Sequence, residues 1–364
     1  MKKILAVAGT RPNFMKIAPL KREFGKHRDK VDFHIVHTGQ HFSGNMSDYF
    51  WADLDIGEPE HYLGITKGAC EIVQIAEIMI GIEKILIQNK YDMLLVVGDV
   101  NSTLAGTLVA SRMGIPIAHI EAGLRSFRFT MPEEQNRIIT DRLSDYLFTH
   151  SPDAKINLFR EDIDESKIFD VGNIMIDSLI YNRSKWQNSS VLIDMGLSIR
   201  EYGVITLHRQ ENVDNKEILH NLLSIIESVC KKIRLLYPIH PRTRKRLEEF
   251  DYWIQVEGID NLIIVPPLGY NDFMKLVENA KFVMTDSGGI QEETTFFEVP
   301  CLTLREETER PITVTVGSNK VVGLSHKLVT EEVDKILSGD YKRGKVPELW
   351  DGLTAGRIVD IIIS

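Results

Sequence analysis

Short apolar runs alternate along the chain with longer segments whose apolar residues have helical spacing. Continuous runs of Val, Ile and Leu separated by helices are typical of parallel strands that are buried on both faces of a sheet. The alternation occurs in both halves of the chain. We expect strands at 4–8, 33–36, 93–97, 116–119, 146–149 and 169–171 in the first half, and at 203–207, 234–237, 262–265, 282–285 and 301–304 in the second.

This alternation predicts an α/β protein with two Rossmann-like, doubly wound domains. At 364 residues the chain exceeds the usual size of a single hydrophobic core. We expect the first domain at 1–180 and the second at 200–350, with the boundary between Ile180 and Tyr202, where the stretch 182–190 is polar and turn-rich. The segment 351–364 has the spacing of a helix that packs back on the first domain. Ligands of open parallel sheets bind beyond the carboxyl ends of the strands, so we expect the site in a central cleft that both domains face.

The composition narrows the class of protein. With 43% hydrophobic and 26% charged residues the chain has an ordinary globular composition, and a formal net charge of −9 argues against a nucleic-acid or anionic-membrane surface. Cys70, Cys230 and Cys301 are far apart and form no CxxC pair, which predicts neither a disulfide framework nor a metal site. No apolar run approaches the roughly 20 residues of a membrane span. We therefore expect a cytoplasmic protein.

A glycine-containing turn in the second half is a candidate anion site. The sequence TDSGGIQEE at 285–293 lies between an expected strand and an expected helix. A strand that turns through Ser287, Gly288 and Gly289 into a helix leaves backbone N–H groups directed at one point, which favours an anion such as a diphosphate. Glu293, one turn into that helix, is placed to bind the two hydroxyls of a ribose. The alternative is that the glycines form an ordinary helix entry.

Two turns in the first half carry candidate binding residues. The sequence GTRPNFMK at 9–16 is not the GxGxxG that binds a dinucleotide, so we expect no nicotinamide cofactor. Arg11 and Lys16 are candidates to contact a phosphate, or else solvated cations near a helix start. His37 and His41 have no carboxylate or thiolate at ligand spacing, so hydrogen bonding is expected there rather than metal binding.

Three carboxylates of the first half are candidates for proton transfer. Asp99 and Glu121 each follow an expected strand, and Glu133 stands beside Glu134 in the first turn of an expected helix. Because neighbouring strand ends meet at one edge of a sheet, Asp99 and Glu121 are expected to lie together, and gathered carboxylates raise one another's pKa toward neutral pH. Each also has a structural alternative. Asp99 is a possible helix cap, Glu121 a partner of Arg125, and the other two are possible helix-dipole acids.

Polar and aromatic residues also follow the strands of the second half. His208 comes after the strand at 203–207 and can donate to negative charge that develops on a phosphate. His240 ends the next strand in the same manner. Arg310 supplies a cation before the last elements, although exposed arginines are common. Phe273 can place an aromatic ring near a base.

A series of motifs runs through the chain in order. They are Gly9-Thr10-Arg11-Pro12, Gln40-His41, Gly98-Asp99, His119 to Arg125, Pro132-Glu133-Glu134 with Asn136-Arg137, Val171-Gly172-Asn173, His208-Arg209 with Glu211-Asn212, Asp286 to Glu293, and Glu309-Arg310-Pro311. Together they resemble the non-hydrolysing UDP-N-acetylglucosamine 2-epimerases, and the likeness covers nearly the whole chain. It implies a GT-B fold, usually a homodimer, and a reaction that needs neither a cofactor nor a metal.

The resemblance also implies a reaction and its residues. In that family a base removes the proton at C2 of the sugar while UDP leaves, which gives 2-acetamidoglucal, and UDP adds back after protonation on the other face. The implied activity is reversible 2-epimerisation of UDP-N-acetylglucosamine to UDP-N-acetylmannosamine by this anti elimination, for surface polysaccharide precursors. By position the catalytic residues are Asp99, Glu121, Glu133 and His208, without a division between base and acid. The substrate-binding positions are Arg11, Lys16, His41, Arg137, His208, Phe273, Ser287, Gly288, Gly289, Glu293 and Arg310.

Some positions depart from the usual pattern of the family. Asn13 stands where the familiar bacterial members have Glu, and Arg128 can pair with a sugar carboxylate. An epimerase of UDP-2,3-diacetamido-2,3-dideoxyglucuronic acid is therefore an alternative. Gln40 and Glu134 are candidates for a second, activating UDP-N-acetylglucosamine site, which the unusual sequence at 240–242 argues against. A GT-B glycosyltransferase and a silent nucleotide-sugar sensor are more distant alternatives, and the three carboxylates argue against both.

Overall fold

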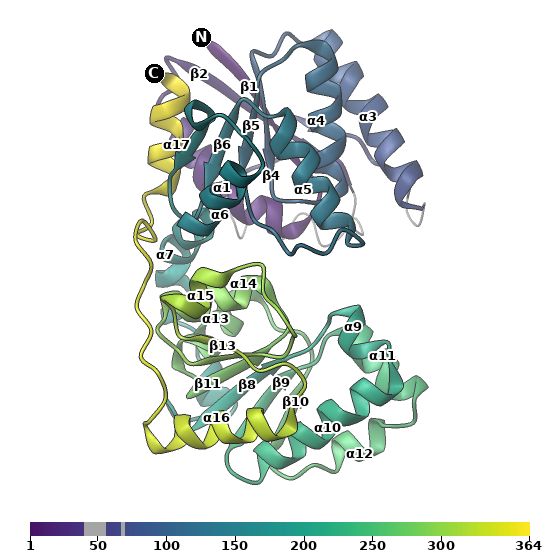
Figure 1. Cartoon of the computed structure of the whole chain (residues 1–364), viewed down its shortest axis with the longest axis vertical. Helices are drawn as coiled ribbons and strands as arrows, with labels where there is room; N and C mark the ends of the chain where they lie inside the picture. The colour runs from purple at the N-terminus through teal and green to yellow at the C-terminus, as the bar shows by residue number, and fades with distance from the viewer. Residues whose placement is uncertain (40–55, 67–69) are drawn as a thin grey trace. The chain divides into compact units, whose positions relative to one another are not determined.

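The computed structural model describes residues 1–39, 56–66 and 70–364 (Figure 1). The chain divides into two compact units, one formed by Met1–Ile180 with Glu348–Ser364 and the other by Tyr181–Pro347. Each unit contains one β-sheet, and the paired strands of both sheets run parallel. The predicted fold class of two doubly wound α/β domains is therefore confirmed.

The first unit is built on a seven-stranded sheet with the order β3-β2-β1-β4-β5-β6-β7. Its described strands are β1 (Lys2–Ala8), β2 (Val31–His37), β3 (His61–Tyr62), β4 (Met93–Val97), β5 (Ile117–Ile120), β6 (Tyr146–Thr149) and β7 (Ile168–Asp170). The central strand β4 is buried along its whole length, as continuous apolar runs require. The two-residue β3 was not expected from the sequence, because it has no apolar run and pairs with β2 at only two positions.

Helices flank the strands of this unit. They are α1 (Arg11–Phe24), α3 (Glu71–Gln88), α4 (Asn101–Met113), α5 (Pro132–Leu143), α6 (Pro152–Arg160), α7 (Ile174–Gln187) and α17 (Thr354–Ile363), with a 3-10 turn at Glu165–Lys167. Helices α3, α4 and α5 pack in a row (Figure 1). Helix α7 runs from the first unit into the second, so the polar stretch expected to hold the boundary begins as helix. Trp186 explains this, because it is fully buried and its Nε1 donates to Glu278 at 2.9 Å.

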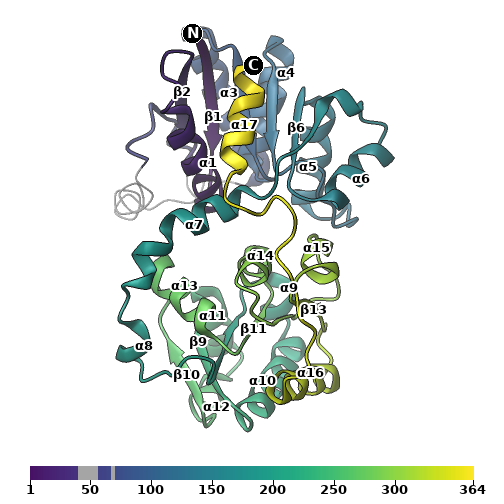
Figure 2. The same cartoon turned by 90° about the vertical axis from the view of Figure 1, so that its left-hand side faces the viewer.

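The last segment of the chain belongs to the first unit, where α17 packs beside α1 (Figure 2). Asp177 of α7 accepts hydrogen bonds from the backbone N–H groups of Thr354 and Ala355 at 3.2 and 2.7 Å, so it caps the start of α17. Before the helix, the buried Trp350 donates from its Nε1 to the carbonyl of His150 at 3.0 Å. Burial raises the pKa of Asp177 to about 6.

The second unit contains a six-stranded sheet with the order β10-β9-β8-β11-β12-β13. Its strands are β8 (Tyr202–Thr206), β9 (Arg234–Pro238), β10 (Leu262–Val265), β11 (Phe282–Thr285), β12 (Cys301–Thr303) and β13 (Asn319–Val321). Its helices are α8 (Val191–Asp194), α9 (Gln210–Val213), α10 (Lys216–Cys230), α11 (Pro241–Glu249), α12 (Trp253–Glu257), α13 (Tyr270–Asn279), α14 (Gly288–Phe296), α15 (Pro311–Thr315) and α16 (His326–Ser338). The short β13 was not expected. None of the described helices is long and apolar enough to cross a membrane.

The strand orders locate the crevices where ligands of such sheets bind. In the first sheet the chain winds outward in one direction from β1 and in the other from β4, and in the second sheet the same reversal lies between β8 and β11. Ligands of open parallel sheets bind at the carboxyl ends of strands at such reversals. Candidate residues follow each of these strands. Arg11 and Lys16 come after β1, Asp99 after β4, His208 after β8, and Ser287 after β11.

Candidate active site

The turn between β1 and α1 is organised by Asn13. Its Oδ1 accepts from the backbone N–H groups of Gly9 and Thr10 at 3.1 and 3.0 Å, and its Nδ2 donates to the carbonyl of Val97 at 3.1 Å. Asn13 is buried and thus ties the turn to the end of β4. An amide suits this position, because one side chain must both accept and donate.

Lys16, Asp99, Glu121 and Arg137 form one buried ionic cluster in the first unit. The Lys16 ammonium pairs with Oε2 of Glu121, and the Arg137 guanidinium pairs with Oδ2 of Asp99 and lies 3.4 Å from Oε1 of Glu121. Lys16, Glu121 and Arg137 are each less than 10% exposed, whereas the Asp99 side chain is 24% exposed. Two cations thus face two carboxylates, and the strand ends bring Asp99 and Glu121 to the same cluster.

Glu121 has an unusual backbone conformation. Its φ of 68° lies in the left-handed region. This conformation is unfavourable for any residue other than glycine, and residues that adopt it are found most often at functional sites. Surrounding contacts hold it there. The Glu121 N–H donates to the carbonyl of Phe148 at 3.1 Å, and its own carbonyl accepts from Arg137. The conformation turns the chain sharply at the end of β5.

A fully buried pair, His119 and Asp141, lies beneath the two loops that carry Asp99 and Glu121. The Nδ1 of His119 is 2.7 Å from Oδ1 of Asp141, and its Nε2 is 2.8 Å from the carbonyl of Gly98. Both ring nitrogens therefore face acceptor groups, the carboxylate of Asp141 and the Gly98 carbonyl. The other oxygen of Asp141 accepts from the Gly123 N–H at 3.1 Å. The pair therefore joins the peptide before Asp99 to the peptides after Glu121.

Charge compensation keeps Asp141 ionised. Burial raises the pKa of Asp141, but His119 and then Arg125 outweigh burial and hold the pKa below its ordinary value. Arg125 contacts Asp141 at 2.7 Å and Glu161 at 2.6 Å. Glu121 therefore pairs with Lys16 and Arg137 while the adjacent Arg125 binds other acids.

The remaining acids of the first unit occupy different environments. Asp99 does not cap α4, whose N-cap is Val100. Glu134 is buried and accepts from the Ser126 N–H at 2.7 Å and the Phe127 N–H at 3.0 Å, so it holds the loop before α5. Glu133 is exposed in the first turn of α5, one helical turn before the arginine of the ionic cluster.

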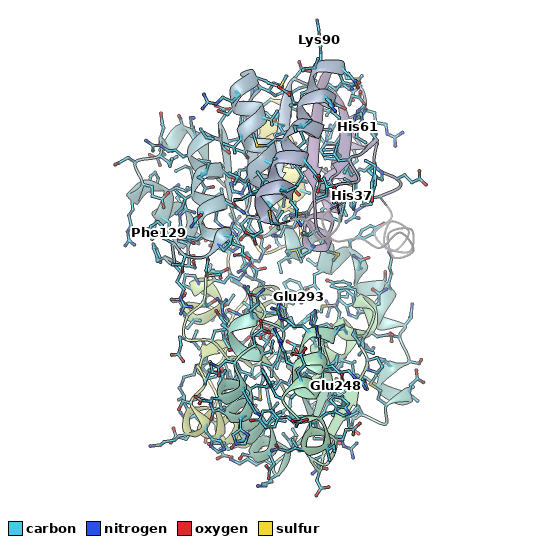
Figure 3. The ribbon with its side chains drawn as sticks, turned by 90° about the vertical axis from the view of Figure 1, so that its right-hand side faces the viewer. His37, His61, Lys90, Phe129, Glu248 and Glu293 are labelled. Atoms are coloured by element: carbon cyan, nitrogen blue, oxygen red, sulfur yellow. The ribbon has the colours of Figure 1, made fainter. Side chains whose placement is uncertain are left out.

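The loop held by Glu134 presents several side chains to solvent. Phe127 has a φ of 58°, and Phe129 is exposed at the edge of the first unit (Figure 3). Arg128 lies exposed between them. The sequence did not predict a functional role for Phe127 or Phe129.

Two sequence candidates lie outside the described residues, namely His41 and Gln40. Arg11 is the first residue of α1, and its side chain is also outside the description. The neighbouring His37 packs between the rings of Phe14 and Tyr62, each 5.0 Å away between centroids. Burial lowers the pKa of His37 to about 4, so the ring is neutral at pH 7.

In the second unit, the start of α14 forms a site suited to an anion. Helix α14 begins at Gly288, and within the described chain its N-cap Ser287 makes no side-chain capping bond. The Arg310 guanidinium lies over this helix end, because a Cβ added to Gly288 would come within 2.5 Å of Arg310 Nη1. Arg310 is held by Glu292 at 2.9 Å and by Glu309 at 3.2 Å. First-turn N–H groups and a fixed guanidinium together favour a phosphate.

Asp286, directly after β11, organises the loop that carries His208. It is fully buried and accepts from the backbone N–H groups of His208 and Arg209, both at 2.9 Å. Oδ1 of Asp286 also lies 2.8 Å from Nδ1 of His208. Burial raises the pKa of Asp286, but the hydrogen bond and charge of His208 outweigh burial and hold the pKa below its ordinary value.

A pocket of about 250 Å³ adjoins these groups in the second unit. It is lined by Thr206, Leu207, His208, Pro238, His240, Pro267, Leu268, Phe273, Ser287 and Ile290. One wall is apolar and aromatic, and the other carries His208 and the start of α14, as a base and a phosphate would require. Glu293 is buried one turn into α14, and the Tyr270 hydroxyl is 3.5 Å from it (Figure 3). A Cβ added to Gly289 would meet no atom within 4 Å.

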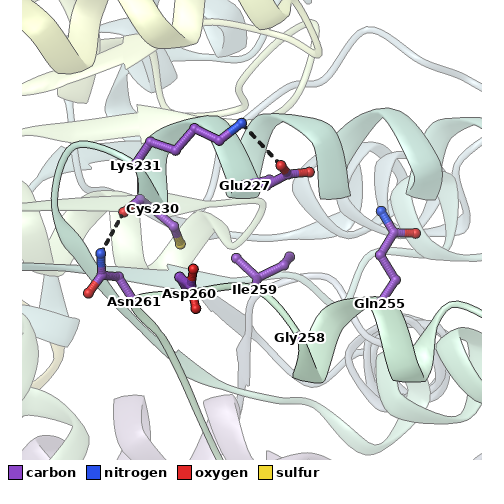
Figure 4. A pocket seen from close by; sticks show the side chains of 8 residues that line it. All are labelled: Glu227, Cys230, Lys231, Gln255, Gly258, Ile259, Asp260 and Asn261. Carbon is purple, nitrogen blue, oxygen red and sulfur yellow. Dashed lines mark hydrogen bonds and ion pairs between the residues drawn. The ribbon is translucent and has the colours of Figure 1, made fainter.

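A second hollow, of about 450 Å³, lies elsewhere in this unit (Figure 4). It is lined by Glu227, Cys230, Lys231, Gln255, Gly258, Ile259, Asp260 and Asn261. Glu227 and Lys231 pair with each other across one turn of α10, and Asn261 donates to the Cys230 carbonyl. Because Asn261 immediately precedes β10, this hollow adjoins the amino end of a strand, away from the carboxyl ends where ligands bind.

Comparison with known proteins assigns the chain, with its ionic cluster in the first unit and its anion site in the second, to a family. Residues 24–363 match the family model of UDP-N-acetylglucosamine 2-epimerase. The chain belongs to the UDP-N-acetylglucosamine 2-epimerase family. The UDP-N-acetylglucosamine 2-epimerase of Methanocaldococcus jannaschii is 42% identical over 367 aligned residues, with 99% of this chain and 98% of that protein covered.

Other members of the epimerase family support the same assignment. A solved structure of the Methanocaldococcus jannaschii UDP-GlcNAc 2-epimerase, in complex with UDP-GlcNAc and UDP, is 41% identical with a TM-score of 0.89, covering 100% of this chain and 99% of that one. The UDP-2,3-diacetamido-2,3-dideoxy-D-glucuronate 2-epimerase of Pseudomonas aeruginosa is 38% identical over 90% of each chain. The family and the GT-B fold class expected from the sequence are confirmed, and the alternative substrate class also occurs among the relatives.

The sequence predicts no role for Asp286 or His119, although both lie within its motifs. A strand-end position was the available signal for Asp286, as it was for Asp99. Asp141 gave no signal, because a single acid inside a polar helix looks like a surface residue until the sheet brings His119 beneath it. Asn13 was noticed only as a departure from the family pattern.

The buried pair yields a prediction about stability. Asp141→Asn is expected to lower the free energy of unfolding by about 3 kcal/mol, because it removes the buried counter-charge of His119 and one of the two carboxylates that pair with Arg125. Urea unfolding followed by circular dichroism measures the change. Glu161→Gln removes the partly exposed partner of the same arginine and is expected to cost less than about 1 kcal/mol. Equal losses in the two variants would contradict this account of the network.

Proposed function

We propose that this protein catalyses the reversible 2-epimerisation of UDP-N-acetylglucosamine to UDP-N-acetylmannosamine. The observation that carries the proposal is the buried cluster in which Arg137 holds Asp99 and Glu121 together, in a chain of the epimerase family. Removal of a weakly acidic carbon proton needs a fixed carboxylate base, and protonation on the other face needs a second acid. The cluster supplies two such groups.

The reaction proposed is an anti elimination followed by re-addition. A carboxylate takes the proton from C2 as the bond between C1 and the diphosphate oxygen breaks, and the electron pair of that bond leaves with UDP. Protonation of 2-acetamidoglucal at C2 on the opposite face and return of UDP to C1 complete the epimerisation. Asp99, Glu121 and Glu133 share the proton transfers, and Lys16 and Arg137 fix the orientation of the first two.

The anion site of the second unit suits the departing UDP. Negative charge builds on the diphosphate as the bond breaks, and prearranged donors stabilise such charge effectively. We assign this task to the N–H groups at Ser287, Gly288 and Gly289, with Arg310 and His208. Phe273 then adjoins the uracil, and Glu293 the ribose. Arg11 and His41 remain assigned to the substrate by family resemblance.

Exchange of the C2 hydrogen tests the proposed activity. In deuterium oxide the enzyme is expected to incorporate deuterium at C2 of UDP-N-acetylglucosamine and to form the manno epimer, both followed by NMR. Glu121→Gln is expected to slow this by about 100-fold or more. A parallel reaction with the UDP-diacetamido-uronate decides the sugar. Exchange without an acceptor excludes a glycosyltransferase, and absence of exchange from both sugars would make the proposal wrong.

Gly288 offers a test of the UDP site. Gly288→Ala places a methyl group within 2.5 Å of Arg310 Nη1, so the guanidinium must move. We expect UDP to bind at least about tenfold more weakly by calorimetry, a change of about 1.4 kcal/mol. In Gly289→Ala the added carbon meets no protein atom within 4 Å, so that variant leaves Arg310 in place. Unchanged UDP affinity in Gly288→Ala would remove Arg310 from the site.

We further propose that the protein is a homodimer that uses the outer face of α3. Ile72, Ile80 and Ile87 are 79%, 53% and 67% exposed along this helix, and exposed apolar stripes often mark interfaces. Light scattering is expected to give twice the chain mass of 41.5 kDa. Ile80→Lys is expected to give the single-chain mass, whereas a monomeric wild type would exclude the dimer.

We place the reaction in the cytoplasm and its product in the synthesis of surface polysaccharide. The described structure leaves Cys70, Cys230 and Cys301 as free thiols, which suits a reducing compartment. Cell fractionation checks the first statement, because recovery of the enzyme outside the cytoplasm would contradict it. Loss of the gene should remove N-acetylmannosamine-derived sugars from surface polysaccharide.

A further inference from the structure

We propose that Asp286 is a positioning residue for His208, which fixes the ring nitrogen that carries a permanent proton and leaves Nε2 to serve the diphosphate. The inference deepens the proposed function and rests on it, because that function gives His208 its task. Asp286 itself need not touch the substrate, since it acts through the histidine.

The contacts of Asp286 account for both of its oxygens. Its carboxylate lies 2.8 Å from the Nδ1 of His208 and accepts from two backbone N–H groups of the His208 loop at 2.9 Å. Asn212 Nδ2 adds a fourth donor at 3.2 Å. Asp286 is fully buried, so no water competes for these positions. The three N–H groups all donate to the carboxylate, which favours its ionised form.

This arrangement determines the protonation pattern of the ring. An ionised carboxylate can only accept, so Nδ1 of His208 carries a proton whether the ring is neutral or charged. Nε2 is then the nitrogen that gains and loses a proton. His208 is 38% exposed and lines the pocket with Ser287 and Phe273, so this nitrogen belongs to the part of the ring that Asp286 does not engage.

The consequence for catalysis concerns the charge of the leaving group. As the bond from C1 breaks, its electron pair moves to the diphosphate oxygen, and the Nε2–H of a protonated His208 donates to that oxygen. The proton remains available when the bond re-forms, so the cycle needs no external acid. The negative charge of Asp286 stabilises the positive ring during this step, as buried carboxylates do for catalytic histidines.

Other charged groups lie near His208, and their effects on a pH profile must be distinguished from the effect of Asp286. The ring of His240, at the start of α11, lies 5.7 Å away between centroids. Burial lowers the pKa of His240, and the charge of His208 lowers it further. Arg209 is the next residue along the chain, and the charge of Arg242 also lowers the pKa of His240.

The decisive variant is Asp286→Asn, which keeps the shape and an acceptor oxygen but removes the charge. We expect kcat at pH 7.5 to fall about 100-fold, with UDP affinity within about threefold of wild type. Because an uncharged partner favours the protonated ring less, the alkaline limb of the kcat profile should move to lower pH and part of the activity should return there. A uniform loss at every pH would mean a structural role and overturn the proposal.

A double-mutant cycle with His208→Ala separates positioning from general damage. If Asp286 acts through His208, Asp286→Asn should lower kcat little further in the His208→Ala background. An equal loss in both backgrounds would overturn the inference. In His240→Asn, whose side chain can still accept from the Arg242 N–H, the limb should keep its wild-type position. If the alkaline limb of the kcat profile shifts in His240→Asn, the limb reports the titration of His240 and not that of His208.

Nitrogen NMR of the wild-type protein gives a readout that does not depend on activity or on a variant that folds. The neutral His208 ring is expected to show a protonated Nδ1 and an unprotonated Nε2. The opposite pattern would overturn the inference even in a fully active enzyme. Conversely, a wild type that shows the expected ring but exchanges neither sugar would reject the proposed function and leave the positioning of His208 standing.

Discussion

The contact of Arg137 with both Asp99 and Glu121 is the interaction on which the first-unit site depends. Parallel strands bring the two carboxylates to one sheet edge, where their charges repel each other and burial removes water that would screen them. A guanidinium between them offsets both effects, and Lys16 adds a second cation from another element. Such a cluster is costly to break, because removing one partner leaves a buried charge without compensation. Its geometry is therefore set before any substrate arrives.

Both units contain a fully buried carboxylate that is paired with a histidine. Asp141 holds His119 beneath the acidic loops, and Asp286 holds His208 beside the anion site. The exposure of the histidine separates their roles. His119 is sealed from solvent and fastens two loops together, whereas His208 is partly exposed and lines a pocket. The same pairing thus positions backbone in the first unit and holds a ring that lines a pocket in the second.

Most of the strands and several candidate site residues could be predicted from the sequence, because the ends of the apolar runs mark the ends of strands. The apolar runs located the long strands, and polar residues that followed them, including Asp99 and His208, lay where a parallel sheet gathers its chemistry. The short strands β3 and β13, of two and three residues, were not accessible, since they have no hydrophobic pattern and depend on the neighbouring strand for register. The ion-pair partners of the carboxylates could not be predicted either. The sequence suggested Arg125 as the partner of Glu121, but spacing along the chain cannot show that two other cations approach from α1 and α5.

The closeness of Gly288 and Arg310 has a consequence for how this family can diverge. The turn at Gly288 has no need of a glycine for its backbone angles, so the restriction comes from the guanidinium that occupies the space of a side chain. The two positions are therefore epistatic. A larger residue at the first position displaces the guanidinium, so the arginine keeps its present place only where the first residue is glycine. Descendants that abandon one of them are expected to abandon the pair.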